Sequence, residues 1–276
     1  MCESCWVLIA KADDDEFLDS LDLNHAERAV LNELYKQGES RVTEILELQG
    51  KELLAAILEL SEELQVDPDE LARLIEDVQS GELFQVKFIE AIQEAFAPLF
   101  QYAGETELKA LDESKVWAVE NTAAARFTSQ LEDLVPSMND TTKDVMLRSL
   151  ERAIAEGATP SERALLVQEV SRTAAEGEEG PFSMQRAQRV ARTFSTAAAN
   201  GGKLEGWRQS EIAKGKRWRS AAGTRTRKSH RKANNQVVPL EKPFDVGDSK
   251  LMHPGDPAGE SKEIVNCRCS MQLVID

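Results

Sequence analysis

Residues 183–202 read SMQRAQRVARTFSTAAANGG and separate two parts of the chain that differ in texture. Ser183 can cap a helix, and the residues after it favour a helix until Asn200-Gly201-Gly202 interrupts the pattern. Before this stretch, apolar residues recur at three- and four-residue spacing, which is typical of amphipathic helices. After it, the helical periodicity weakens and Gly, Pro and Asn become frequent. We therefore expect a helix over 183–200 that joins a helical N-terminal region to a smaller C-terminal module.

Capping residues and apolar stripes predict consecutive helices in the N-terminal region. Asp67-Pro68-Asp69-Glu70 combines a capping aspartate with a proline at the first helical position, and Thr159-Pro160-Ser161-Glu162 has the spacing of a capping box. Apolar stripes also begin near Val42 and near Phe88. We expect Gly50 to be a weak point of the first and the second to stop near Gly104.

The C-terminal module contains short segments that favour strands. Residues 216–220 and 264–275 alternate between apolar and polar side chains. Residues 236–240 follow a turn candidate, Asn234-Asn235, and favour one arm of a hairpin. Residues 248–262 are expected to form a loop.

Composition supports a helical fold. The chain has 276 residues, of which 41% are hydrophobic, so it can bury a substantial core. Aromatic residues are only 5%, which favours helices packed with aliphatic side chains over a β-sandwich. The sequence therefore predicts a mainly α fold with two domains. These are a helical, acidic region over 1–180 and a small, basic α+β module with a few short strands over 181–276.

Several classes of protein are excluded or disfavoured. No run of 18 apolar residues is present, so we expect no membrane span. The first ten residues have an apolar run but no basic leader, so we expect no secretory signal. Four cysteines do not make a disulfide framework, which favours a reducing, intracellular setting. Neither a phosphate-cradling glycine loop nor a convincing nucleophile–base pair is found, so we expect no enzymatic activity.

The charge of the chain is concentrated in one window. The net charge is −16, yet residues 181–235 contain 14 Lys and Arg against two acids, Glu205 and Glu211, a local charge of +12. The remainder carries −28. Such an asymmetry favours a face that binds a polyanion, and equally a basic face that docks on the acidic remainder of the same chain or of a neighbour.

The cations of this window could follow a nucleic-acid backbone, with Trp207 and Trp218 interleaved. No zinc finger, RNA-recognition motif or repeat that reads bases is present, so binding is expected to be independent of sequence. The candidate DNA-binding residues are Arg186, Arg189, Arg192, Lys214, Lys216, Arg217, Arg219, Arg225, Arg227, Lys228, Arg231 and Lys232.

The cysteines form two closely spaced pairs, Cys2 with Cys5 and Cys267 with Cys269. Thiol pairs at this spacing suit zinc in a reducing compartment, and one four-thiolate site would tie the chain ends together. On a straight strand Cys267 and Cys269 would lie too far apart, so the backbone would have to bend there. His230, flanked by basic residues, is an alternative ligand. The competing interpretation is that the first pair is incidental and the second simply packs.

An ordered series of short motifs over about residues 183–274 resembles the phage Mu F-like head morphogenesis, or minor head protein, family. In chain order the motifs are Arg186-Ala187-Gln188-Arg189-Val190-Ala191-Arg192-Thr193, Trp218, Arg225-Thr226-Arg227-Lys228-Ser229-His230, Gln236-Val237-Val238 with Phe244, Met252-His253-Pro254-Gly255-Asp256-Pro257, and Asn266-Cys267-Arg268-Cys269. The chain departs from the family at Ala222-Gly223-Thr224, where members commonly have an acidic residue.

The resemblance implies a low-copy virion protein of a tailed bacteriophage, located at the portal vertex or inside the capsid and present in the host cytoplasm during assembly. It also implies a role in head morphogenesis, with contact to DNA inside the head or passage with DNA at ejection. Its implied partners are the portal protein, double-stranded DNA without sequence preference and, as a further expectation, the major capsid protein. Two other functions remain open at this stage. One is an enzyme or toxin-like module that uses the Arg, His and Cys residues, and the other is a zinc-stabilised cytosolic adaptor.

Overall fold

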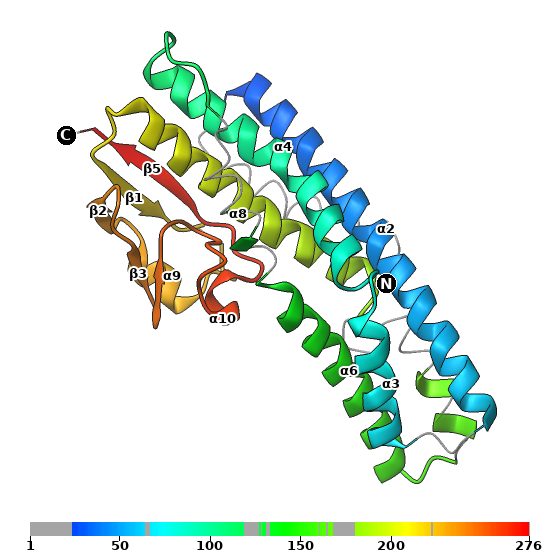
Figure 1. Cartoon of the computed structure of the whole chain (residues 1–276). Coiled ribbons are helices and arrows are strands. Elements are labelled where there is room, and N and C mark those ends of the chain that lie inside the picture. Colours follow the sequence, from blue (N-terminus) through cyan, green and yellow to red (C-terminus); the bar gives the residue numbers. More distant parts are fainter. Residues whose placement is uncertain are drawn as a thin grey trace. The chain divides into compact units, whose positions relative to one another are not determined.

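The computed structural model describes residues 24–63, 67–118, 127, 129–130, 133–159, 161–163, 165–167, 180–221 and 223–275 (Figure 1). The fold is mainly α with a few short strands in the C-terminal part, which confirms the predicted class. None of the described helices combines the length and the apolar character that crossing a membrane requires. The described helices of defined extent are α2 (His25–Glu63), α3 (Pro68–Ser80), α4 (Val86–Leu111), α6 (Val135–Ala155), α8 (Met184–Ser210), α9 (Lys228–Ala233) and α10 (Ser261–Ile264). The strands are β1 (Gly215–Arg219), β2 (Val237–Pro239), β3 (Phe244–Val246), β4 (Ser249–Leu251) and β5 (Ser270–Val274).

The chain packs into two compact units. Unit 1 consists of Met1–Gly38, Gln93–Leu131 and Arg189–Asp276, and unit 2 consists of Glu39–Ile92 and Glu132–Gln188. These units describe packing along the chain, and the two-domain division expected at residue 180 stays a prediction.

Unit 2 is held by an aliphatic core between α2, α3 and α6. Leu53 and Ile57 of α2 meet Leu71 and Ile75 of α3, together with Met146 of α6, and all five are fully buried. Complete burial of such side chains contributes roughly 1.5–3 kcal/mol each. The apolar stripes that predicted these helices therefore mark their buried faces.

The predicted helix starts are confirmed. Asp67 accepts hydrogen bonds from the backbone N–H groups of Asp69 and Glu70, at 2.8 and 2.9 Å, and Pro68 begins α3. Thr159 and Glu162 form the capping box, in which the N–H of Thr159 donates to the Glu162 carboxylate at 2.7 Å. These helix starts could be predicted from the sequence because the residues that form a cap are close neighbours in the chain.

The glycines expected to interrupt helices lie inside them instead. Helix α2 continues through Gly50, where a Cβ atom would lie 3.0 Å from the ring of Phe182. Helix α4 continues through Gly104, where a Cβ atom would lie 2.1 Å from Trp117. The predicted end of the 183–200 helix was also wrong, because α8 continues to Ser210. Each of these two glycines leaves room for a neighbouring aromatic side chain and does not interrupt its helix.

In unit 1, α8 lies between α4 on one side and strands β5 and β1 on the other (Figure 1). Glycines bring α8 very close to α4. A Cβ atom at Gly202 would lie 2.2 Å from the carbonyl oxygen of Phe100, and one at Gly206 would lie 2.3 Å from that of Gly104. No side chain fits between α8 and α4 at these two positions, so the backbones of the two helices are in direct contact.

The strands of unit 1 form two small antiparallel sheets. In the three-stranded sheet β1 lies between β2 and β5, with Lys216 opposite Val238 and Leu273. Strands β3 and β4 form a two-stranded sheet. The predicted strand at 216–220 is thus confirmed as β1.

Three strand predictions need correction. Strand β2 pairs with β1 through a connection that contains α9, so no tight hairpin forms there. The expected 248–262 loop contains β4 and the beginning of α10. The strand expected from residue 264 begins only at Ser270, because Ile264 ends α10 and Asn266 has a φ of +58°, which a strand does not allow.

Candidate metal centre and cationic surface

Three potential metal ligands meet in the interior of unit 1. The Nδ1 atom of His230, on α9, lies 3.3 Å from the Sγ of Cys269 and 3.7 Å from the Sγ of Cys267. The three ligand atoms lie within 4.8 Å of one another, and each side chain is at most 2% exposed. One imidazole and two thiols form a donor set suited to a soft or borderline divalent cation. The His230–Cys267–Cys269 group could therefore hold a metal ion.

Cys267 and Cys269 lie outside the regular strands, where the spacing of the two sulfurs is not limited to that of a straight strand. Cys267 and Cys269 precede β5 in a segment without strand pairing, and the N–H of Cys269 donates to the Sγ of Cys267 at 3.4 Å. Helix α8 fixes this segment. The hydroxyl of Thr196 donates to the carbonyl of Cys267 at 2.7 Å, and the amide of Asn200 donates to that of Cys269 at 3.1 Å.

A buried carboxylate lies beside the histidine. The Nε2 of His230 lies 3.2 Å from the Oε2 of Glu263, which also accepts a hydrogen bond from the hydroxyl of Ser229 at 2.7 Å. Metal-binding histidines usually present one nitrogen to the metal and the other to a carboxylate or carbonyl. Glu263 occupies that outer position here, which leaves Nδ1 facing the sulfurs. No sequence pattern pointed to Glu263, because its role depends on where α10 packs.

The two thiols differ in their readiness to ionise. The hydrogen bond from Cys269, together with His230, holds the pKa of Cys267 well below the ordinary thiol range. Donating that hydrogen bond, with burial, raises the pKa of Cys269 well above it. Because a metal binds thiolates, Cys267 is the sulfur already poised for coordination.

A small cavity of about 20 Å³ adjoins the ligand group, and Arg225, Arg227 and Arg268 are among the residues that line it. That volume accommodates about one water molecule. Cys2 and Cys5 lie outside the described residues, so a four-cysteine site stays a prediction. The alternative ligand, His230, is the one that the structure brings to Cys267 and Cys269.

The predicted DNA-binding cations separate into two groups. Arg186, Arg192 and Lys216 are buried, and Arg217 and Arg227 are half-buried. The exposed members are Arg189, Lys214, Arg219, Arg225, Lys228, Arg231 and Lys232. We call Lys228, Arg231 and Lys232, which all lie on α9, the α9 cation cluster.

The buried cations make internal contacts. Arg186 donates to the carbonyl of Met138 at 2.8 Å, and Arg192 donates to the Oδ1 of Asn266 at the same distance. Among the described residues, the Nζ of Lys216 has no hydrogen-bond partner, and it lies 5.4 Å from the centre of the Phe244 ring. Burial lowers the pKa of Lys216 to about 8. The interleaved tryptophans, Trp207 and Trp218, are also core residues, at most 1% exposed.

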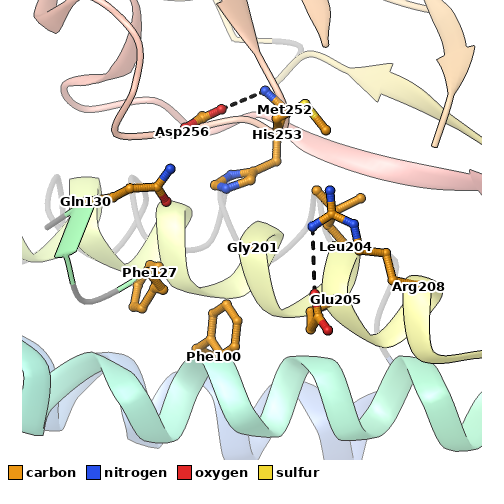
Figure 2. A pocket seen from close by; sticks show the side chains of 10 residues that line it. All are labelled: Phe100, Phe127, Gln130, Gly201, Leu204, Glu205, Arg208, Met252, His253 and Asp256. Atoms are coloured by element: carbon orange, nitrogen blue, oxygen red, sulfur yellow. Dashed lines mark hydrogen bonds and ion pairs between the residues drawn. The ribbon is translucent and has the colours of Figure 1, made fainter. Parts of the chain in front are cut away.

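A second cavity, of about 110 Å³, lies between α4, α8 and the His253–Asp256 turn (Figure 2). Figure 2 shows the imidazole of His253 pointing toward Gly201 of α8. The Nδ1 of His253 lies 3.1 Å from the carbonyl of Pro254, and burial lowers the pKa of the imidazole. Asp256 accepts from the N–H of Met252 at 2.6 Å and so closes the turn. The His-Pro-Gly-Asp motif thus builds a tight loop against α8.

Comparison with known proteins gives a family for the C-terminal half. A family model described as Phage Mu protein F like protein matches residues 144–272. A curated relative, the uncharacterized protein YqbB of Bacillus subtilis (strain 168), is 31% identical over 99 residues, which cover 34% of this chain and 32% of that protein. The chain therefore matches about a third of the relative's length. No solved structure matches.

The matched region includes α8, α9, the candidate metal ligands and the exposed cations. A match of this kind indicates a bacteriophage head protein. The resemblance drawn from the short motifs is confirmed: residues 144–272 of this chain match the family described as Phage Mu protein F like protein.

Proposed function

We propose that this protein is a minor head protein of a tailed bacteriophage, a low-copy virion component at the portal vertex that acts in head morphogenesis and contacts double-stranded DNA without sequence preference. The observation that carries the DNA contact is the α9 cation cluster. Lys228, Arg231 and Lys232 are exposed on one short helix, in a chain whose net charge is −16. Neighbouring Arg219 and Arg225 are exposed too.

The exposed residues favour contact with the DNA backbone over reading of bases. Lys and Arg neutralise phosphates and release condensed counterions, a contribution that does not depend on sequence. Helix α9 has six residues, and the two aromatic candidates, Trp207 and Trp218, are buried. Neither a long recognition helix nor an exposed tryptophan therefore supports base readout in the described C-terminal part.

The DNA contact is tested by salt-dependent binding of the full-length chain to a random-sequence duplex. A Lys228→Gln, Arg231→Gln and Lys232→Gln triple variant should bind more weakly, and its slope of log affinity against log salt should fall by about 2–3, since each phosphate contact contributes about 0.9. The matched control replaces three exposed lysines elsewhere, Lys36, Lys51 and Lys87, with glutamine. Equal losses in both variants would show attraction by overall charge rather than a surface at α9.

The location in the particle is tested separately. Mass spectrometry of purified virions should find this chain at a small fraction of the major capsid protein, and co-expression with the portal protein of the same phage should yield a complex that elutes together in size-exclusion chromatography. Absence from purified virions would exclude the head role and favour a cytosolic adaptor.

We propose zinc as the metal for the His230–Cys267–Cys269 group, because two thiolates and an imidazole are common ligands of structural zinc. Elemental analysis of the purified chain should give one zinc per molecule. Replacing Cys2 and Cys5 by serine tests the larger, four-thiolate site. If zinc content is unchanged in that variant but lost in Cys267→Ser, the ligand set is the one that the structure brings together.

We propose a structural role for these thiols rather than a catalytic one. Glu263, His230 and Cys269 do form the chain of contacts that activates a cysteine nucleophile. A nucleophile must reach its substrate, however, and Cys269 is only 2% exposed. Slow alkylation of Cys267 and Cys269 by iodoacetamide in the folded protein would support the structural role, whereas rapid alkylation would favour an enzyme.

A further inference from the structure

Helix α9 carries the cation cluster on one side and a candidate metal ligand on the other. It has only six residues, and a helix of that length is not stable by itself in water. Its conformation therefore depends on what its inward side contacts. That side consists of His230 and Ala233, which are 2% and 1% exposed.

His230 is the polar anchor of this inward side. Its Nδ1 faces the two sulfurs and its Nε2 faces Glu263, while its ring meets the edge of Trp218 at 5.6 Å between centroids. The hydroxyl of Ser229 donates a hydrogen bond to the same carboxylate. All of these contacts are therefore made by two consecutive residues, Ser229 and His230, directly beside the exposed Lys228 and Arg231.

The sulfurs are fixed to a different and much larger element. The carbonyls that flank them accept hydrogen bonds from Thr196 and Asn200, both fully buried on the 27-residue helix α8. A metal ion bound by His230, Cys267 and Cys269 would thus link the short helix by coordinate bonds to the cysteine segment, which hydrogen bonds hold against α8. Without the ion, this connection is limited to weak contacts between an imidazole and two thiols.

We propose that metal binding at the His230–Cys267–Cys269 group orders α9 and thereby strengthens the binding of its cation cluster to DNA phosphates. The inference rests on the proposed function, since it concerns how the same surface is controlled. Ordering α9 in advance removes a conformational cost that DNA binding would otherwise bear. The coupling is reciprocal, so DNA must tighten metal binding by the same factor.

The test compares the full-length chain in two states, loaded with Zn²⁺ and stripped by a chelator that is then removed. Fluorescence anisotropy with a labelled duplex at constant ionic strength should show affinity at least about fivefold higher in the zinc-loaded state. Hydrogen exchange should show increased protection of residues 224–235 in that state even without DNA. A competition titration with a chromophoric chelator should show zinc affinity rising by the same factor when DNA is added.

Two variants separate the metal from the charges. The α9 cation-cluster variant (Lys228→Gln, Arg231→Gln and Lys232→Gln) should bind Zn²⁺ as the wild type does, yet lose DNA affinity. Glu263→Gln keeps all three ligands but weakens the orientation of His230. It should bind Zn²⁺ about 10-fold more weakly and need correspondingly more zinc to reach wild-type DNA affinity. Recovery at high zinc distinguishes this positioning role from general misfolding.

The outcomes distinguish this inference from the proposed function. DNA affinity that is the same with and without zinc, with unchanged exchange at 224–235, overturns the coupling alone and leaves the DNA contact standing. Absence of salt-dependent DNA binding in both states overturns the proposed DNA contact, and the coupling with it. Failure of the chain to bind zinc at all also overturns the coupling.

Discussion

Lys216 is a charged residue that lies in the protein core. It lies on the inward face of β1, on the same face as Trp218, and its side chain is fully buried beside Phe244. In the part of the chain that the structure describes, no hydrogen-bond partner reaches its Nζ, so the ammonium is poorly compensated and burial lowers its pKa to about 8. A count of charges along the sequence places Lys216 among the candidate DNA-binding cations, because the count does not show which face of a strand is buried.

Lys216→Met should stabilise the protein at pH 7 by about 1–3 kcal/mol, because it removes a buried cation without a partner. The gain should shrink as pH rises. Between pH 8 and the ordinary lysine pKa of 10.5, the unfolded state binds more protons than the native state, so wild-type stability increases with pH. Denaturant unfolding at pH 7, 9 and 10 measures this difference. The exposed residue Lys232 gives the control, Lys232→Met, whose effect should not depend on pH in this way.

At the scale of elements, glycines decide how the helices of unit 1 pack. Gly202 and Gly206, one turn apart on α8, face backbone carbonyls of α4 at distances that exclude a Cβ atom. From sequence alone a glycine in a helical pattern is ambiguous, since it can end a helix or allow another element to approach. The caps at Asp67 and Thr159 were predictable because their partners are three residues away or fewer. The glycine contacts were not, because they join segments about a hundred residues apart.

Gly206→Ala should destabilise the protein by about 1–3 kcal/mol, despite the better helix propensity of alanine. The new Cβ atom would lie 2.3 Å from the backbone oxygen of Gly104, which cannot rotate away. Gly50→Ala is the matched control, since the nearest neighbours of its Cβ would be side-chain atoms of Phe182, at 3.0 Å. Urea unfolding should therefore separate two identical substitutions, both in helix interiors. Equal effects would contradict the direct contact of α4 with α8.

At the scale of the whole molecule, the candidate metal group belongs entirely to unit 1. His230, Cys267 and Cys269 all lie in the segment Arg189–Asp276, as do the strands and the α9 cation cluster. The sequence predicted Cys267, Cys269 and His230 as ligands from chelating spacing and flanking charge. It did not predict Glu263 or the anchoring by Thr196 and Asn200, because these depend on how distant segments pack.

Zinc should stabilise unit 1 selectively. At a free zinc concentration of 100 times Kd, mass action raises the free energy of unfolding by about 2.7 kcal/mol. Trp117, Trp207 and Trp218 lie in unit 1, whereas the residues of unit 2 include no tryptophan. Tryptophan fluorescence should therefore show a larger zinc-dependent shift of the unfolding transition than circular dichroism at 222 nm, which reports on both units. Coincident shifts by both methods would indicate that the chain unfolds as one cooperative system.

Helix α8 is buried on all sides over much of its length: every residue from Val190 to Leu204 is buried. One side meets α4 through glycines, and another holds the cysteine segment through Thr196 and Asn200. An ordinary surface helix has an exposed face on which most substitutions are tolerated. Helix α8 has no exposed face along those four turns. A saturation mutagenesis map of the gene should therefore show an unbroken band of intolerance there, and drift in related phages should be slowest in the same codons.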